Sequence, residues 1–340
     1  MNTFGMKVKA RCFMEYDSVA DLVDIEFEEL ARPVLHIGGG SNLLFTDDFK
    51  GTVLHSKIDF IEILDEDRPA TDPVMVSVGA GVIFDDFCEW AAKENLWGVE
   101  NLSYIPGEVG ASAVQNIGAY GVEVKDVIRT VYCYDTIEEE FVKFDVSECQ
   151  YGYRDSIFKN PEVKGRYIVT HVVFALSRTP QPKLEYGHID AAVKDAQDAR
   201  GAALTPSLIR KVIIKIRKEK LPEPSVMGSA GSFFKNPVIT KEHYQQIESA
   251  AKAEFGPDFK VPHYDLPDGA VKVPAAWMIE QCGWKGRRSG GAAVYDKQPL
   301  VIVNYTGEAF PEEIIGLERR IIESVKKKFG VELHPEVDHI

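Results

Sequence analysis

The sequence has few of the features that mark membrane, secreted or metal-binding proteins. No apolar run approaches the roughly 20 residues that cross a bilayer, and the start turns polar too early for a secretory signal. The five cysteines are widely spaced and form no C-x-x-C pair, which argues against a disulfide framework or a cysteine metal site. The eight histidines show no zinc-site spacing. We expect a cytoplasmic protein with reduced thiols and without a catalytic metal.

Positive charge is also scarce. The chain has 39 Lys and Arg against 53 Asp and Glu, a formal net charge of −14. This balance disfavours binding to nucleic acid or to an anionic membrane surface. The composition is that of an ordinary globular protein, and 340 residues suffice for two or three domains. An anionic ligand would therefore need a local pocket of basic side chains.

The apolar pattern predicts a mixture of strands and helices. Short strands are expected over residues 34–37, 74–78, 131–134, 141–144 and 167–176. A helix should begin at residue 84 and run to about residue 95. Two longer amphipathic helices are predicted over residues 206–220, with Thr205 as cap, and over residues 311–329, ended by Gly330. A domain boundary is expected after the first of these.

A glycine-rich turn follows the first predicted strand. Gly38-Gly39-Gly40-Ser41-Asn42 combines glycines, which take positive φ and leave backbone N–H groups uncovered, with short polar side chains. Such a turn can accept a pyrophosphate. It matches neither the G-x-G-x-x-G pattern nor the phosphate-binding P-loop. A plain tight turn in a sheet protein remains the alternative.

A second glycine-rich stretch, residues 105–121, is small and almost uncharged. Its backbone could lie exposed along an extended uncharged ligand such as a flavin ring, which needs backbone donors and a dry face. The alternative is a buried loop packed closely on a neighbouring helix. Together with the first turn, this stretch predicts a long cofactor.

Several polar residues could carry chemistry. Ser232 lies in a hydroxyl-rich turn without a G-x-S-x-G elbow, so it is a candidate proton donor and not a hydrolase nucleophile; a purely structural turn is the alternative. Arg154 could bind a carboxylate or pair with Asp155. Glu336 is one acid among many. Candidate phosphate or nucleotide contacts, each of which could equally be a surface residue, are Tyr186, Lys220 and Lys285.

In order along the chain, these segments resemble the bacterial UDP-N-acetylenolpyruvoylglucosamine reductases, flavoenzymes of peptidoglycan synthesis. The resemblance covers nearly the whole chain and is carried by residues 2–5, 38–44, 105–121, 153–156, 231–237, 290–294 and 335–337. Tyr186 lies where a subclass of the family has an extra tyrosine-bearing segment. After Glu336-Val337 the family usually has an arginine, whereas this chain has Asp338.

The resemblance implies an α+β fold in three parts. Two subdomains would form an FAD-binding fold of the vanillyl-alcohol-oxidase type, residues 1–57 with residues 330–340 returning to it, and residues 58–218. Residues 219–329 would form a C-terminal α+β substrate-binding domain. FAD would be bound without a covalent bond, and NADPH would be the co-substrate. We expect a monomer.

The resemblance also implies a reaction and a set of site residues. FAD would transfer hydride from NADPH to UDP-N-acetylglucosamine enolpyruvate, giving UDP-N-acetylmuramate. Ser232 would supply the proton, while Arg154 and Glu336 would bind and polarise the carboxylate. The nucleotide and sugar would be held by Tyr186, Lys220, Asn236, Lys285 and Gln298. The cofactor would be held by Gly38, Gly39, Gly40, Ser41, Asn42, Pro106, Gly107, Gly110, Ala111, Gln115, Asn116, Ile117, Gly118 and Ala119.

Two other functions stay open from the sequence. The same flavin fold could act on a different small molecule, which would leave the enolpyruvyl sugar nucleotide without effect. A protein that binds UDP-sugar without redox chemistry would be colourless when purified. Ser232, Arg154 and Glu336 disfavour the first alternative, and the two glycine-rich segments disfavour the second.

Overall fold

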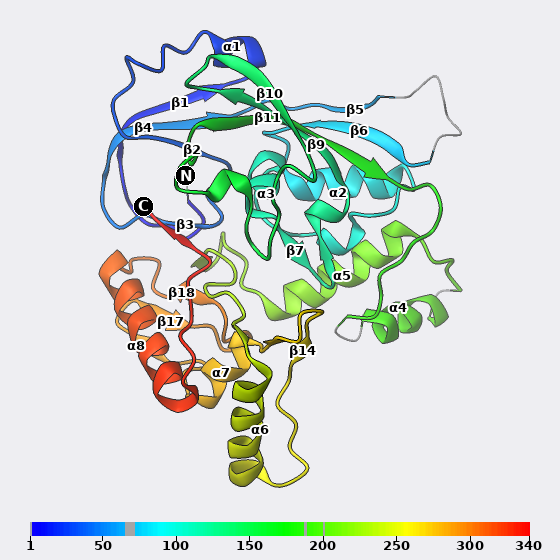
Figure 1. The fold of residues 1–340 in the computed structure, drawn as a ribbon, viewed down its shortest axis with the longest axis vertical. Helices are drawn as coiled ribbons and strands as arrows, with labels where there is room; N and C mark the ends of the chain where they lie inside the picture. Colours follow the sequence, from blue (N-terminus) through cyan, green and yellow to red (C-terminus); the bar gives the residue numbers. More distant parts are fainter. Residues whose placement is uncertain (1, 65–71, 187–188, 200) are drawn as a thin grey trace. The chain divides into compact units, whose positions relative to one another are not determined.

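The structure is a computed structural model, which describes residues 2–64, 72–186, 189–199 and 201–340 (Figure 1). The chain forms two compact units from segments that are distant in sequence. The large unit contains Lys9–Gly40 and Asp48–Lys218, and the small unit contains Met1–Val8, Ser41–Asp47 and Glu219–Ile340. Among the helices of the described residues, none is long and apolar enough to span a bilayer.

The large unit is built on a five-stranded antiparallel sheet with strand order β10-β9-β11-β6-β5. The apolar runs supply its inner strands because their side chains are covered on the sheet faces. The strands are β5 (Ile61–Ile63), β6 (Val74–Gly79), β9 (Ile128–Asp135), β10 (Glu140–Asp145) and β11 (Tyr167–Leu176). The strands predicted in this region are therefore confirmed.

A second sheet of the large unit has three parallel strands, β1 (Ala10–Tyr16), β4 (Phe49–Ser56) and β2 (Val34–Ile37), with β4 in the centre. The predicted strand at residues 34–37 is confirmed. Most of β4 is buried, as expected for a central parallel strand. At Gly51 a Cβ atom would lie 1.8 Å from the Pro33 carbonyl oxygen, so only glycine fits there.

Two helices cover one face of the five-stranded sheet (Figure 1). The predicted helix α2 (Phe84–Lys93) packs Phe87 on Phe174 of β11, with ring centroids 4.6 Å apart. The other, α3 (Val109–Gln115), lies inside the glycine-rich stretch that we expected to be an exposed loop. That expectation was wrong for these residues: the small side chains allow a helix to lie close to the sheet, with Ala113 fully buried.

The remaining elements of the large unit are short, apart from α5 (Pro206–Lys220). This predicted helix is confirmed: the Leu208 amide donates to Thr205 Oγ1 (3.2 Å), and the helix ends just before Leu221. The last two residues of α5 belong to the small unit. The other elements are α1 (Val19–Val23), α4 (Ile189–Asp198), β7 (Gly118–Ala119), β8 (Val122–Glu123), and the 3-10 turns Glu100–Leu102, Val124–Asp126 and Ile157–Lys159.

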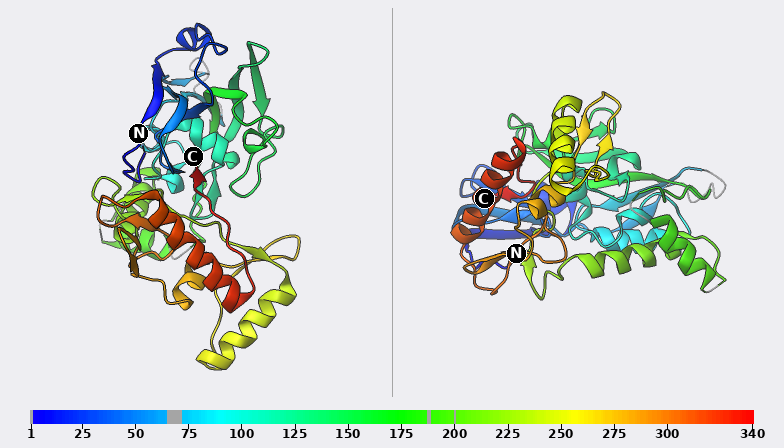
Figure 2. Two further views of the ribbon diagram at one scale, coloured as in Figure 1. Left: turned by 90° about the vertical axis from the view of Figure 1, so that its left-hand side faces the viewer. Right: turned by 90° about the horizontal axis from the view of Figure 1, so that it is seen from below.

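The small unit combines short strands with three helices. Helix α8 (Pro311–Phe329) packs on β17 and β18 (Figure 2), as its buried residues at helical spacing require. It ends at Gly330, whose φ is +67°, so the prediction for this helix is confirmed. The other helices are α6 (Lys241–Phe255) and α7 (Ala275–Gln281).

Three small sheets complete this unit. The four-stranded sheet has the order β12 (Gly228–Ser229), β18 (Ile302–Asn304), β17 (Ala292–Val294), β16 (Arg288–Ser289). The three-stranded sheet has the order β13 (Val238–Ile239), β15 (Val271–Lys272), β14 (Tyr264–Asp265). In the third sheet, β19 (Asp338–His339) pairs in parallel with β3 (Leu43–Leu44), so the end of the chain joins a segment almost 300 residues earlier.

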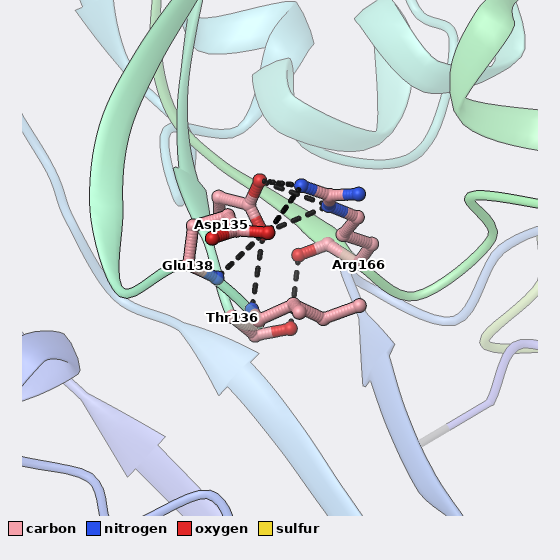
Figure 3. Close-up of polar contacts among 5 residues, drawn as sticks. Asp135, Thr136, Glu138 and Arg166 are labelled. Carbon is pink, nitrogen blue, oxygen red and sulfur yellow. Dashed lines mark hydrogen bonds and ion pairs between the residues drawn. The ribbon is translucent and has the colours of Figure 1, made fainter.

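A buried ion pair fixes the junction between β9 and β11 (Figure 3). The Asp135 carboxylate accepts hydrogen bonds from Arg166 at 2.6–2.9 Å and from the amides of Ile137 and Glu138. Burial raises the pKa of Asp135, but these hydrogen bonds outweigh burial, so its pKa lies below the ordinary value. The ionised carboxylate therefore stabilises the fold.

We predict that Arg166→Met lowers the free energy of unfolding at pH 7 by about 2 kcal/mol, because the buried Asp135 charge loses its partner. A depressed pKa stabilises the fold above the unfolded-state value, and this contribution is lost as pH falls through the folded-state value. The difference from wild type should thus shrink below about pH 4. Urea unfolding at pH 7 and below about pH 4 measures this difference in the free energy of unfolding. Arg129→Met, on the exposed face of β9, is the control. An equal loss in both variants would contradict the prediction.

Candidate active site

The first three residues of the glycine-rich turn belong to the large unit and directly follow β2. At Gly38 a Cβ atom would lie 3.0 Å from Ala111 Cβ and 3.2 Å from Glu108 Oε2. Gly40 has a φ of +65°. The turn thus lies against the start of α3, and the two glycine-rich segments singled out from the sequence are in contact.

The start of α3 is attached to the segment after β6 by backbone hydrogen bonds. Gly110 donates to Ala80 (2.9 Å), Val109 donates to Val82 (2.9 Å), and Gly107 accepts from Phe84 (3.0 Å). A Cβ atom at Gly110 would lie 2.9 Å from Ala80 Cβ, so this approach also depends on glycine. Pro106 and Ala111 are exposed, whereas Gly107 is half-buried with a φ of +118°.

The end of α3 is held by its own polar side chains. Asn116 is buried in the left-handed conformation, and its Nδ2 donates to the Gly152 carbonyl (2.7 Å) and to Glu123 (3.0 Å). Gln115 Oε1 accepts from Lys159 Nζ (2.7 Å). The Nε2 atom of Gln115 is buried and has no hydrogen-bond partner among the residues that the structure describes.

Arg154 lies against the segment that follows α3. Its guanidinium donates to the carbonyls of Asn116 (3.2 Å) and Gly118, and Nη1 would be 2.9 Å from a Cβ at Gly118. Arg154 has a φ of +56°, which is unusual for a residue with a side chain. The structure therefore places the predicted carboxylate-binding arginine beside four predicted cofactor residues, Asn116, Ile117, Gly118 and Ala119.

Tyr186 contacts the end of the segment that follows α3, at Tyr120 and Gly121. Its ring meets Tyr120 edge to face, with centroids 6.4 Å apart, and a Cβ atom at Gly121 would lie 3.3 Å from the Tyr186 Cβ. Burial raises the pKa of Tyr120 against the lowering effect of Arg217. Arg217 also donates to the Tyr104 carbonyl (3.0 Å). These contacts join the predicted nucleotide-binding tyrosine to the large unit.

In the small unit, Ser232 lies in a loop that aromatic residues anchor. Phe233 and Phe234 are almost fully buried, and Gly231 turns the chain with a φ of +68°. The Phe233 amide donates to the Leu300 carbonyl (2.8 Å). Ser232 itself is half-buried. The loop is therefore firmly held, while the serine side chain is not enclosed by the small unit.

Glu336 is held next to this loop. Its amide donates to the Phe233 carbonyl (2.8 Å), and its carbonyl accepts from Asn42 Nδ2 (3.0 Å). The Asp338 amide donates in turn to the Asn42 carbonyl (3.0 Å). The structure thus brings together Ser232 and Glu336, two of the three predicted catalytic residues, with Asn42 from the glycine-rich turn.

The other predicted substrate contacts in the small unit have different surroundings. Asn236 Oδ1 accepts from the Ala275 amide at the start of α7 (2.9 Å). Lys285 forms an exposed ion pair with Glu280 (2.7 Å). Gln298 is half-buried, and Lys220 is exposed. Asn236 therefore shares the anchored Ser232 loop, whereas for Lys220, Lys285 and Gln298 a role in binding stays a prediction.

Three polar residues near the site were not predicted: Lys159, Arg217 and Glu108. Lys159 contacts the predicted residue Gln115, and the Glu108 carboxylate lies close to the predicted residue Gly38. Arg217 contacts Tyr120, which directly follows the predicted residue Ala119. The sequence carries little signal for them, because each is one charged residue among many. Glu108 lies within the glycine-rich stretch of residues 105–121, Lys159 follows Arg154 by five residues, and Arg217 lies in the predicted helix over residues 206–220.

The large unit has features that fit a flavin dinucleotide. Gly38 and Gly39 are half-buried and carry no side chain in the turn, where a diphosphate would need backbone N–H donors. Gln115 Nε2 is a buried donor without a partner among the described residues, and the segment after α3 is small and uncharged. A flavin ring needs such donors and such a dry surface.

Comparison with known families and relatives agrees with these features. The family described as "FAD binding domain" matches residues 11–138, and "UDP-N-acetylenolpyruvoylglucosamine reductase, C-terminal domain" matches residues 223–340. A UDP-N-acetylenolpyruvoylglucosamine reductase of Bacteroides fragilis is 50% identical over 340 residues, which cover 100% of this chain and 97% of the relative. That of Chromobacterium violaceum is 45% identical, covering 98% and 95%.

A solved structure supports the fold. The crystal structure of the UDP-N-acetylenolpyruvylglucosamine reductase from Thermus caldophilus matches with a TM-score of 0.63 and 23% identity, over 99% of this chain and 95% of that one. The predicted α+β fold with an FAD-binding domain is confirmed. FAD is the cofactor that this domain binds.

We predict that Asn42→Ala loosens the C-terminal segment that contains Glu336, because the Glu336 carbonyl loses its side-chain hydrogen bond. The free energy of unfolding should fall by about 1 kcal/mol. Amide hydrogen exchange should become faster in residues 333–340 and stay unchanged in α8. Gln246→Ala, on the exposed side of α6, is the control. Unchanged amide exchange in residues 333–340 would show that the Asn42 side chain does not hold this C-terminal segment.

Proposed function

Because the chain belongs to the family of UDP-N-acetylenolpyruvoylglucosamine reductases, FAD enzymes of peptidoglycan precursor synthesis, we propose that it reduces UDP-N-acetylglucosamine enolpyruvate to UDP-N-acetylmuramate with NADPH. The single observation that carries the proposal is the full-length match at 50% identity to a reductase of this name. The position of Glu336 beside the Ser232 loop supports it. We expect a cytoplasmic monomer.

The reaction adds a hydride and a proton across the enolpyruvyl double bond. When bound, FAD would supply the hydride-transfer chemistry that links NADPH to the terminal carbon of the enol ether. The adjacent carbon, which bears the carboxylate, must then receive a proton. The chain's own residues have to supply that proton and stabilise the negative charge that develops next to the carboxylate.

We assign the proton to the Ser232 hydroxyl. Its loop is anchored by two buried phenylalanines and by the Phe233 hydrogen bond to Leu300, which suits a donor that must stay oriented. We assign binding and polarisation of the carboxylate to Arg154 and Glu336. The guanidinium of Arg154 can form paired hydrogen bonds with a carboxylate, and its own position is fixed by the carbonyls of Asn116 and Gly118.

We further propose that most of the residues that hold FAD belong to the large unit, and that the C-terminal part of the chain supplies most of the contacts to the UDP-sugar. The cofactor residues would be those of the glycine-rich turn and of residues 106–119. Tyr186, Lys220, Asn236, Lys285 and Gln298 would contact the sugar nucleotide. In terms of domains, residues 1–57 with 330–340 and residues 58–218 would form the FAD-binding part, and residues 219–329 the substrate part. This division differs from the two compact units, which group residues 1–8, 41–47 and 330–340 with residues 219–329.

The proposed function predicts a two-step change in flavin absorbance under anaerobic conditions. NADPH should bleach the purified protein, and UDP-N-acetylglucosamine enolpyruvate should then restore the colour, because each half-reaction changes the flavin's redox state. Bleaching without restored colour would indicate another substrate for the same flavin fold. A protein that stays colourless after addition of FAD would be a sugar-nucleotide binder without redox chemistry.

We predict that Ser232→Ala keeps FAD binding and reduction by NADPH but slows reoxidation by the enolpyruvyl substrate by about 10²–10⁴-fold, the usual contribution of a general acid. Stopped-flow absorbance separates the two half-reactions. The control is Ser249→Ala on the exposed side of α6, whose hydroxyl contacts only its own helix in the described residues. Reoxidation at the wild-type rate in Ser232→Ala would remove this serine as the proton donor.

A further inference from the structure

A buried histidine lies beneath the glycine-rich turn of the large unit. His55, on β4, is almost completely buried, and its Nδ1 lies 2.8 Å from Glu15 Oε1 on β1. Its Nε2 lies 2.9 Å from Glu108 Oε1, just before α3. The imidazole thus connects a central strand to the segment that packs against Gly38.

The two carboxylates fix the protonation state of His55. An ionised carboxylate only accepts hydrogen bonds, so both ring nitrogens must carry a proton, and the ring is an imidazolium. The hydrogen bond to Glu108 raises the pKa of His55, burial opposes this, and Glu15 raises the pKa further. The geometry and the direction of the pKa shift both favour the imidazolium form of His55.

The other titratable groups around His55 do not supply positive charge. His36 on β2 is bonded to the Tyr16 hydroxyl (2.7 Å), and burial lowers its pKa to about 4, so it is neutral at pH 7. Burial raises the pKa of Tyr16, which is therefore neutral as well. His55 carries the positive charge of this cluster, facing the acids Glu15 and Glu108.

The two carboxylates differ in their access to water. The Glu15 side chain is 44% exposed, whereas that of Glu108 is 11% exposed. Glu108 is also the acid next to the turn: Cβ atoms at Gly38 and Gly39 would lie 3.2 Å and 3.7 Å from its carboxylate oxygens. An uncompensated charge at Glu108 would repel an anionic group at the turn, and water could not screen it well.

We propose that His55 is a positioning residue for FAD: it neutralises the Glu108 carboxylate and holds it in place, so that the turn at Gly38–Gly40 can receive the anionic diphosphate of the cofactor. This inference rests on the assignment of the glycine-rich turn to FAD in the proposed function. It explains why a chain of net charge −14 can keep an acid at this position. The residue acts through Glu108 and needs no contact with FAD.

The test is FAD binding by the apoprotein, followed by quenching of flavin fluorescence. His55→Gln should weaken binding about tenfold or more, since it removes the positive charge and leaves the Glu108 charge. His55→Gln combined with Glu108→Gln should regain most of the affinity, because the repulsion is gone. His171→Gln, which removes a histidine stacked on Tyr132 elsewhere in the large unit, should bind FAD like the wild type.

The pH dependence of binding gives a second readout that needs no variant to fold. Because the pKa of His55 is raised above 6.5, the imidazolium persists at pH 6.5, and the affinity for FAD should fall as pH rises through the folded-state pKa. In the double variant this loss should be absent. A wild-type affinity that is constant between pH 6 and pH 9 would overturn the proposal.

The remaining outcomes of the FAD-binding experiment also test the proposed role of His55. If His55→Gln weakens binding and the double variant does not recover, His55 has a structural role and the charge proposal is wrong. If His55→Gln binds as tightly as the wild type, the proposal is wrong as well. These results are independent of the sugar nucleotide: failure of UDP-N-acetylglucosamine enolpyruvate to restore flavin colour would overturn the proposed substrate and leave the FAD result standing.

Discussion

The close approach of backbone segments around Gly38 and Gly110 is the constraint on which the large unit's part of the site depends. Side-chain-free positions let the turn after β2 lie against α3, and let α3 lie against the segment after β6. Asn116 lies at the end of α3, and its carbonyl accepts a hydrogen bond from Arg154. A Cβ atom at Gly38 would lie 3.0 Å from Ala111 Cβ, and one at Gly110 would lie 2.9 Å from Ala80 Cβ, so a larger residue at either position would strain the packing of α3.

In the small unit, the C-terminal end of the chain positions Glu336. Glu336 reaches the Ser232 loop because β19 pairs with β3 and because Asn42 binds the Glu336 carbonyl. The short motif from Gly38 to Asn42 therefore serves both units, with its glycines in the large unit and its last two residues in the small one. One turn carries residues proposed for the cofactor and also supports a residue proposed for catalysis.

In this acidic protein, two carboxylates with little exposure are paired with nearby side chains. The partner of Asp135 is Arg166, and the partner of Glu108 is His55. Such pairs add little net stability, but removing one partner leaves a buried charge uncompensated and is costly. At the Gly38 turn the same pairing has a further consequence, because the neutralised acid lies where we propose that an anionic cofactor binds.

The sequence by itself determined the helices Pro206–Lys220 and Pro311–Phe329, the strands β2, β6, β9, β10 and β11, and the family, because periodicity, caps and motifs are local signals. It did not indicate β1, β4 or β5. It did not indicate α3, since small residues signal a loop as readily as a helix packed on a sheet. The pairing of His55 with Glu15 and Glu108, and of Asn42 with Glu336, was decided by tertiary structure alone. These partners are 40 to 294 residues apart, so no local pattern in the sequence shows which residue pairs with which.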